Sequence, residues 1–485
     1  MRSYYPVFSA LGLILMIFGL LMGFPLTVSF FMHDGATTAY DEALLITFAA
    51  GLLLWAWTRR TDRKLRTRDG FLLVSATWLV TPCFAMLPLL LYLPELSITD
   101  AYFEAASGLT TTGATVLSGL DQLPISINLW RCFLHWVGGM GVIVLVVAIL
   151  PVLGIGGRQL FKAETPGPIK ESTLTPRITE TAKGLWLTYL LLTVACGLAL
   201  WLAGMDGWNA LIHAFSIMGL GGFSTYDSSL AAFNSVPIEI VTIVFACLAG
   251  LNYATHYMVI VRRSWRPYGY DPELKYFFLV LAGSTVMLTA FLYLQPDHAA
   301  LPTVFRLVIF QVVSMATSLG LTTTDYATWP VFAQLWILFL SSFAACSGST
   351  GGGIKMSRAM ILYKQVFSEV LLALHPAALR RVKFSHTPVP GSILHAVLAF
   401  GFIYMACIII LTLLLGGSGL DLITAFSAVI ACLNNAGPGM ALVGPAQNYA
   451  VLTDFQTWVC AFAMILGRLE IFTLLVVLTP VFWRK

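Results

Sequence analysis

Four short loops, each centred on a glycine, interrupt the apolar sequence and suit a cation site made of main-chain oxygen atoms. The four loops are Thr110–Thr115, Gly219–Ser224, Thr317–Thr322 and Asn434–Gly439. Glycine adopts without steric cost the backbone angles that turn consecutive carbonyl groups toward one side. Such carbonyl groups replace the water around a dehydrated cation, so the chemistry that these loops predict is ion coordination.

The predicted ligands are the carbonyl groups of the two residues that precede each loop glycine. The loop glycines are Gly113, Gly222, Gly320 and Gly437. The predicted ligand residues are Thr111, Thr112, Leu220, Gly221, Ser318, Leu319, Asn435 and Ala436. Any single loop is also compatible with an ordinary glycine-rich bend at a helix end. The recurrence of four loops in the same setting favours an ion site.

The composition places the chain in a membrane. Of its 485 residues, 58% are hydrophobic and 10% are charged, whereas about 25% are charged in an average soluble protein. Irregular backbone occurs at membrane depth only where it is buried in protein or lines a water-filled cavity. The first apolar run, 5–31, is longer than the apolar region of a signal peptide, so we expect a retained transmembrane helix.

Basic residues indicate which connections lie in the cytoplasm. Of the 27 lysine and arginine residues, 24 fall at Arg2 and in the stretches 59–68, 158–183, 262–275, 355–383 and 484–485. The positive-inside rule assigns these places, including both chain termini, to the cytoplasm. The outward segments between them carry acidic residues, which would concentrate cations near an entrance.

This charge pattern divides the chain into five units that each begin and end in the cytoplasm. They are a two-helix hairpin, 1–69, and four pore repeats, 70–157, 158–266, 267–383 and 384–485. Each repeat is expected to contain a first helix, a half-helix (the pore helix), the glycine-bearing filter loop and a second helix. The predicted fold is an all-α integral membrane protein with ten spanning helices, four re-entrant helices and fourfold pseudo-symmetry around one central ion pore.

Hydrophobic runs give approximate bounds for these elements. First helices are expected at 71–94, 184–204, 275–295 and 391–416, half-helices at 99–109, 207–218, 302–316 and 419–433, and second helices at 128–152, 236–262, 330–366 and 453–483. A span needs about 20 apolar residues to cross the hydrocarbon, which the first and second helices provide. At roughly 1.5 Å per residue the half-helices reach only about halfway, so each must turn back at its glycine loop.

A glycine-rich segment in the second helix of the third repeat predicts an unwound gate. It contains Gly348, Ser349, Thr350, Gly351, Gly352, Gly353 and Lys355. Each glycine costs a helix roughly 1 kcal/mol relative to alanine, so a continuous helix is unfavourable here. A flexible loop below the filter would open or block the ion path with small backbone changes. Close helix packing through small residues is the alternative.

Arg468 is the basic residue that lies deepest in an apolar segment. It stands about 15 residues before Trp483, near the predicted bilayer centre, where arginine costs at least ~2.5 kcal/mol unless it faces water or a partner. We expect Arg468 to line the inner path as an electrostatic barrier to cations. The alternative is a structural bond to Glu470 or to a carbonyl group. Arg131 and Arg306 are expected to snorkel or to form local ion pairs.

Two further polar features have competing interpretations. His135 and the glycine run 138–141 favour helix packing over ion contact, because small residues allow helices to approach closely. Glu104, within the first half-helix, either attracts cations or makes a capping or structural hydrogen bond.

With these motifs the chain resembles the Trk/Ktr/HKT superfamily of cation transporters, most closely its bacterial Trk-type potassium-uptake membrane subunits. The resemblance covers essentially the whole chain and includes the amino-terminal hairpin. It is carried by the four filter loops, by His135–Gly141, by Ser347–Gly353 and by Gly467–Arg468. A serine in place of the first filter glycine accompanies sodium preference in this superfamily. Four glycines therefore imply potassium bound at the eight ligand residues, and the resemblance also implies the gating roles given above.

The resemblance also implies a location and partners. It implies a homodimer in the bacterial inner membrane with a cytosolic, nucleotide-binding regulatory subunit of the TrkA type. The chain has no G-x-G-x-x-G or P-loop motif, so we expect potassium as the bound ion, no organic cofactor here and nucleotide only on the regulatory partner. The basic loops would face anionic membrane lipid, and no nucleic-acid partner is expected.

The sequence leaves the transport mechanism open. A passive potassium pore and an H⁺- or Na⁺-coupled potassium symporter would share the same filter and gate. A transporter with a solute site at the midplane would predict inverted repeats and acidic residues on the path. An enzyme would require clustered nucleophile and base residues. Neither pattern is visible in the sequence, so we expect a transport protein that is not an enzyme.

Overall fold

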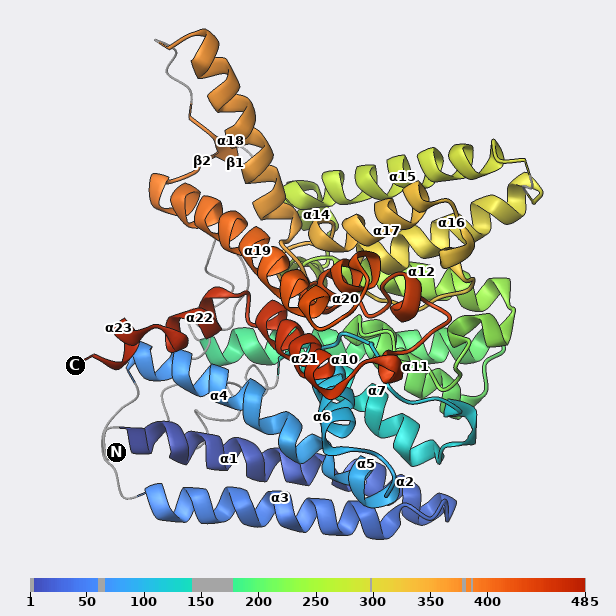
Figure 1. Ribbon diagram of the computed structural model, residues 1–485, viewed down its shortest axis with the longest axis vertical. Coiled ribbons are helices and arrows are strands. Elements are labelled where there is room, and N and C mark those ends of the chain that lie inside the picture. Colours follow the sequence, from blue (N-terminus) through green and yellow to red (C-terminus); the bar gives the residue numbers. More distant parts are fainter. Residues whose placement is uncertain are drawn as a thin grey trace.

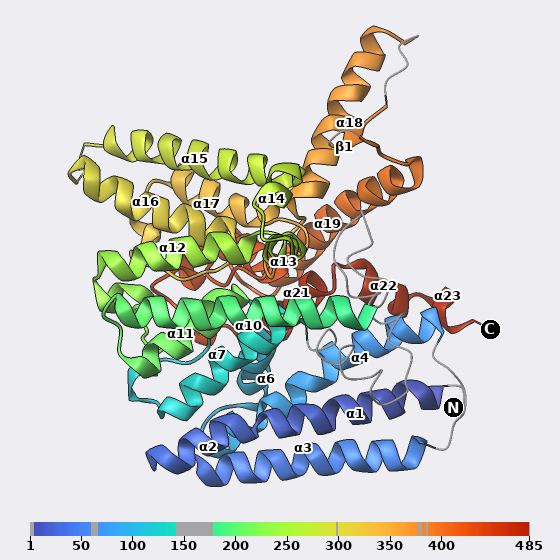
Figure 2. The same cartoon turned by 180° about the vertical axis from the view of Figure 1, so that it is seen from behind.

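The computed structural model of the protein describes residues 4–59, 66–141, 178–296, 299–376, 381–384 and 387–484. Over these residues the fold is almost entirely helical, as predicted. The antiparallel-packed helices α1 (Tyr5–Leu21) and α3 (Thr37–Thr58) form one edge, and α15 (Pro272–Tyr293) with α16 (Leu301–Ala316) forms the opposite edge (Figures 1 and 2). Both chain termini lie at the same end of the helices (Figure 1).

Six helical segments of the described chain are long and apolar enough to cross a membrane. They are Tyr5–Met32 (α1 with α2, Gly23–Met32), Thr37–Thr58 (α3), Arg68–Tyr92 (α4, Thr67–Ala85, with α5, Leu87–Tyr92), Ala182–Leu202 (within α10, Ile178–Leu202), Pro272–Tyr293 (α15) and Gly391–Gly417 (α19). Two bent helix pairs raise the total to 8 if each pair is one span. The chain is therefore a multi-pass membrane protein. The predicted total of ten spans stays a prediction.

The structure contains a helix at each of the four places where a half-helix is predicted. These helices are α6 (Ile98–Leu109), α11 (Gly207–Gly219), α16 (Leu301–Ala316) and α20 (Leu422–Leu433). Three of them begin at a capping side chain, because Ser97, Asp206 and Asp421 each accept the backbone N–H three residues later at 3.0 to 3.1 Å. With 12 to 16 residues, these helices are too short to span about 30 Å of hydrocarbon.

Two of the second helices are broken where the prediction has one continuous helix. Helices α12 (Val236–Gly250) and α13 (Tyr253–Arg262) meet at 95°, and α21 (Asp454–Arg468) and α22 (Phe472–Leu478) meet at 113°. Helix α13 restarts at Asn252, whose side chain accepts the Ala254 N–H at 2.9 Å. Before α22, Glu470 and Ile471 have positive φ values of 51° and 59°. The prediction was wrong here because hydrophobicity does not reveal left-handed backbone or a new helix cap.

The second helix of the third repeat is unwound where the glycine-rich segment predicts it. Helix α17 (Val331–Phe343) ends before the segment, and α18 (Met356–Leu374) begins after it. We call residues 344–355 the intramembrane loop. In the first repeat, α7 (Ile125–Gly139) ends beside Gly141, which has a φ of 71°. The rest of the predicted helix 128–152, the boundary at 157–158 and the basic residues up to 177 lie outside the described residues.

Helix α18 and the beginning of α19 project beyond the other helices (Figures 1 and 2). Near this projection, strand β1 (Lys383–Phe384) pairs antiparallel with β2 (Thr387–Pro388). The remaining elements are short helices, α14 (Arg266–Tyr270) and α23 (Pro480–Trp483), and the 3-10 turns Leu120–Gln122, Ser229–Phe233, Tyr326–Thr328, Ala441–Val443 and Tyr449–Val451.

The amino-terminal hairpin is fastened to the first repeat through Asp34. Its carboxylate accepts the Ser126 N–H at 3.0 Å and the Ser29 hydroxyl at 2.5 Å. Burial opposes ionisation of Asp34, but the hydrogen bonds from Ser29, Ser126 and Ala36 outweigh it and lower the pKa of this carboxyl. Tyr40 adds a hydrogen bond of 2.8 Å to the Ser126 carbonyl oxygen. The hairpin is thus part of the packed protein.

Close packing of α1 on α3 generates a stability prediction. A Cβ on Gly51 would lie 2.7 Å from the Gly12 carbonyl oxygen. We expect Gly51→Ala to lower stability by about 1–3 kcal/mol through overpacking, seen as a lower unfolding temperature of the purified protein. Gly283→Ala in α15 is the control, since no atom of the described residues lies within 4 Å of its added Cβ. Equal effects of the two substitutions would contradict this packing.

Candidate functional site

The four half-helices end in the same backbone motif. In the first, the Thr111 N–H bonds the Gly108 carbonyl at 3.1 Å and the Thr112 N–H bonds the Ser107 carbonyl at 2.9 Å. The same two bonds recur from Leu220 and Gly221, from Ser318 and Leu319, and from Asn435 and Ala436. The first residue of each pair is left-handed, with φ values of 56°, 52°, 63° and 52°. This is the helix-ending Schellman motif, here formed by residues other than glycine.

The four loop glycines follow with φ values of 78° to 85° and meet in a closed ring. A Cβ on Gly113 would overlap the Gly221 carbonyl oxygen, and one on Gly222 would overlap that of Leu319. A Cβ on Gly320 would lie 2.5 Å from the Ala436 oxygen, and one on Gly437 would lie 2.7 Å from the Thr112 oxygen. Each loop therefore touches the next, and the fourth returns to the first. The structure brings together all four loops singled out by the sequence.

The ring contains carbonyl groups without a protein donor. All eight predicted ligand residues are buried. Within the described part of the chain, none of their carbonyl oxygens accepts a hydrogen bond. Buried backbone carbonyls are nearly always paired, because an unpaired one loses its interaction with water. Eight such oxygens gathered at converging loops are chemically suited to a cation.

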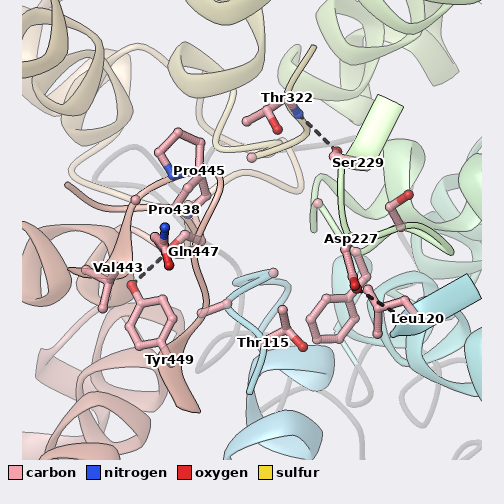
Figure 3. Close-up of a pocket in the computed structure, with 18 of the residues that line it drawn as sticks. Thr115, Leu120, Asp227, Ser229, Thr322, Pro438, Val443, Pro445, Gln447 and Tyr449 are labelled. Atoms are coloured by element: carbon pink, nitrogen blue, oxygen red, sulfur yellow. Dashed lines mark hydrogen bonds between the residues drawn. The ribbon is translucent and has the colours of Figure 1, made fainter. Parts of the chain in front are cut away.

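A cavity of about 70 Å³ opens on one side of the ring, with all four loop glycines in its wall (Figure 3). Hydrogen bonds between the outer segments of neighbouring repeats surround it. Asp227 accepts the Leu120 N–H at 3.1 Å, and the Thr322 N–H donates to Ser229 at 3.1 Å (Figure 3). The other two links are Tyr326 to the Gly439 carbonyl at 3.2 Å and the Tyr449 N–H to the Thr115 carbonyl at 2.8 Å. This second set of contacts also joins all four repeats.

These outer contacts include residues whose structural contacts the sequence does not predict. Asp227, Tyr326 and Tyr449 stand in outward segments with no recurring spacing relative to the loop glycines. Tyr449 also donates its hydroxyl to the Gly437 carbonyl at 2.9 Å. Only the three-dimensional meeting of the repeats gives these side chains a role.

A buried ion pair supports the first loop. The side chains of Arg131 and Glu104 are 2.8 Å apart and at most 1% exposed. Glu104 also accepts the Val116 N–H at 3.0 Å and the Thr115 hydroxyl at 3.0 Å. Glu104 thus makes the structural hydrogen bonds that were one of its two expected roles. Arg131 is ion-paired and does not snorkel.

The second predicted pair joins neighbouring repeats. Arg306 of α16 makes two hydrogen bonds of 2.7 Å to the carboxylate of Glu239 in α12. The Arg306 side chain is 34% exposed, so its charge retains contact with the surroundings.

The intramembrane loop packs against the ends of the half-helices. A Cβ on Gly351 would lie 2.6 Å from the Thr317 carbonyl oxygen, and one on Gly352 would overlap that of Asn434. Thr350 donates its hydroxyl to the Met218 carbonyl at 3.1 Å. The loop therefore reaches the ends of three of the four half-helices, and glycine at 351 and 352 permits two of these contacts.

Other bonds tie the intramembrane loop to surrounding helices. The Cys346 N–H bonds the Gly250 carbonyl at 3.0 Å, and the Ser347 N–H bonds the Glu273 carboxylate at 2.8 Å. The buried Lys355 donates to the Gly351 carbonyl oxygen. The loop is unwound but has defined partners at both ends.

Arg468 joins the loop, the ring and α7. It donates to the Thr350 carbonyl at 3.0 Å, to the Thr111 hydroxyl at 3.2 Å and to the carbonyl oxygens of Gly138 and Gly139. The structural partner expected for Arg468 is Glu470 or a carbonyl group, and the structure shows carbonyl groups. Glu470 pairs with Arg358.

His135 and its neighbouring glycines occupy packing positions. A Cβ on Gly221 would overlap the His135 ring, which stacks on Phe223 at 4.2 Å. A Cβ on Gly138 would overlap the Leu109 carbonyl, and one on Gly139 would lie 2.8 Å from Gly219. These contacts agree with the packing interpretation.

Apolar spans around four short helices whose loops meet in a ring define a class of membrane transport protein. The chain belongs to the TrkH family, whose family model, described as "Cation transport protein", matches residues 36–484.

Individual relatives match over nearly their whole length. The Trk system potassium uptake protein TrkH of Salmonella typhimurium is 43% identical over 475 residues, 98% of each chain. The protein of the same name from Vibrio parahaemolyticus is 42% identical over 488 residues, 100% of each chain. The crystal structure of the potassium transporter TrkH from Vibrio parahaemolyticus matches with a TM-score of 0.89 at 40% identity over 100% of both chains.

The buried ion pair generates a second stability prediction. We expect Glu104→Gln to lower the free energy of unfolding by about 3–5 kcal/mol, because it leaves the Arg131 charge buried without its counter-charge. The unfolding temperature of the purified protein measures this effect. Glu239→Gln is the matched control and should cost less than about 1 kcal/mol, since Arg306 is partly exposed. A greater loss of stability from Glu239→Gln than from Glu104→Gln would contradict the role given to the buried Glu104–Arg131 pair.

Proposed function

We propose that this chain carries potassium into a bacterial cell through a central pore, with the four filter loops as its selectivity filter. The names of the TrkH relatives support potassium as the transported ion. The single observation that carries the filter proposal is the closed ring of loops with eight carbonyl groups of buried residues, to which no donor within the described residues is bonded.

In this proposal main-chain oxygens replace the water around each potassium ion. The residues are those predicted from the sequence, the two that precede each of Gly113, Gly222, Gly320 and Gly437. Four half-helix carboxyl ends converge there and add partial negative charge, which favours a cation. Potassium is the cargo, and the proposal requires no organic cofactor in this chain.

The intramembrane loop and Arg468 form the proposed gate. The loop packs against the half-helix ends of three repeats, so it would obstruct the path in the conformation described here. The fixed positive charge of Arg468 would repel a cation on the same path. Opening would separate Arg468 from the Thr350 carbonyl and move the glycines 351–353 away from the half-helix ends.

The proposed setting is the bacterial inner membrane, as a homodimer with a TrkA-type nucleotide-binding regulatory subunit in the cytosol. The positive-inside pattern and the common end of both termini support cytoplasmic termini (Figure 1). The projecting α18 and α19 would offer a surface for a cytosolic partner (Figure 2). The exposed basic residues Arg381 and Lys383 would also contact anionic lipid headgroups.

The ring generates a selectivity prediction. We expect Gly113→Ser to reduce the potassium-to-sodium permeability ratio by about tenfold, which equals about 1.4 kcal/mol, because its Cβ displaces the Gly221 carbonyl. Reversal potentials of the reconstituted protein in potassium and sodium gradients measure the ratio. Gly119→Ser is the control, because Gly119 also has a positive φ, of 69°, but an added Cβ would meet no atom of the described residues within 4 Å. Loss of selectivity in both variants, or in neither, would contradict the filter proposal.

The gate generates a flux prediction. We expect Arg468→Ala to increase rubidium-86 flux into proteoliposomes about tenfold, because it removes both the fixed charge and the bond to the Thr350 carbonyl. Arg262→Ala, at the exposed end of α13, should leave the flux unchanged. Unaltered flux and selectivity in Arg468→Ala would rule out the barrier role.

A further inference from the structure

The junction between the fourth and first filter loops has a side-chain bond that the other three junctions lack among the residues the structure describes. The Asn435 side-chain amide donates to the Thr112 hydroxyl at 2.9 Å and to the Met464 carbonyl at 3.0 Å. Over the described residues, it makes the only side-chain to side-chain hydrogen bond between two of the four filter loops. At the other junctions the residue before the glycine is Gly221, Leu319 or Ala436, none of which has a polar side chain.

This bond holds the backbone that closes the ring. The Thr112 carbonyl oxygen is the atom that a Cβ on Gly437 would meet at 2.7 Å. The Asn435 side chain therefore fixes the same residue whose carbonyl group forms the last contact of the ring. Thr112 and Asn435 are 323 positions apart in the sequence, so no short chain segment maintains their separation.

Asn435 is well placed to act as a rigid spacer. Its φ of 52° matches the left-handed backbone of the other loops, and its side chain is fully buried. The amide nitrogen is fixed at two points, one in the first loop and one in α21. A second hydroxyl, that of Thr110, lies 2.8 Å from the Thr112 hydroxyl and extends the network to the end of α6.

We propose that the Asn435 side chain is a specificity-determining group that keeps the fourth-to-first junction at the spacing required for potassium over sodium. The inference rests on the proposed filter function. Whether a filter discriminates by cavity size or by the field of its carbonyl groups, a displaced Thr112 carbonyl would alter the coordination of the smaller ion.

A double-mutant cycle tests this inference. Thr112→Val removes the hydroxyl and keeps the branched shape, and Asn435→Leu removes the amide. Leucine is accepted in this conformation, because Leu220 occupies the equivalent position of the second loop with the same φ of 52°. The measurement is the potassium-to-sodium permeability ratio from reversal potentials of the reconstituted full-length protein.

Each single substitution is expected to lower the ratio about tenfold, and the double variant is expected to lower it no further, because both remove one interaction. An unchanged ratio in both single variants, or independent effects that multiply to about a hundredfold, would overturn the proposal. If Asn435→Leu does not fold, Thr112→Val breaks the same bond from the other side.

Two controls separate this inference from the filter proposal. Thr289→Val removes a buried hydroxyl of α15 for which the described residues provide no hydrogen-bond partner, and it should leave the ratio unchanged. Gly113→Ser tests the ring itself. If Gly113→Ser lowers the ratio while Asn435→Leu and Thr112→Val do not, the junction proposal fails and the filter remains. If none of these variants changes the ratio, the filter proposal fails too.

Discussion

The rest of this structure depends on the contact between each loop glycine and the carbonyl oxygen of the next loop. No Cβ fits at Gly113, Gly222, Gly320 or Gly437 without displacing main-chain atoms. Because the fourth contact returns to Thr112, the loops cannot open independently at one junction without straining the others. Half-helices, outer hydrogen bonds and the buried Arg131 pair all support this ring of backbone.

The ring of loops carries a free-energy cost that a bound cation would offset. Buried carbonyl groups without donors are unfavourable, and the described part of the chain gathers eight of them where four helix carboxyl ends meet. A bound cation would offset that cost, which connects the stability of the loops with the transport that we propose. The intramembrane loop and Arg468 contact the ends of the half-helices. The cavity lies at the loop glycines (Figure 3).

Much of this architecture could be predicted from local sequence. The half-helices follow hydrophobic runs and begin at residues such as Asp206 and Asp421, so their positions are readable. The glycines of residues 348–353 correctly predict that the second helix of the third repeat is unwound. The bends before α13 and α22 were not predicted, because the first arises from a new helix cap at Asn252 and the second from left-handed residues such as Ile471, both inside apolar segments. The contacts of Tyr449 and Asn435 are unpredictable for another reason, since they join residues far apart in the sequence.

The central claim is that main-chain oxygens of the four filter loops bind the transported ion. Anomalous diffraction from crystals grown in rubidium or thallium salts tests it most directly. The account predicts anomalous peaks on the axis of the ring, coordinated by the carbonyl oxygens of Thr112, Gly221, Leu319 and Ala436. Peaks that lie only outside the ring, or a ring with no peak when the ion saturates transport, would contradict it.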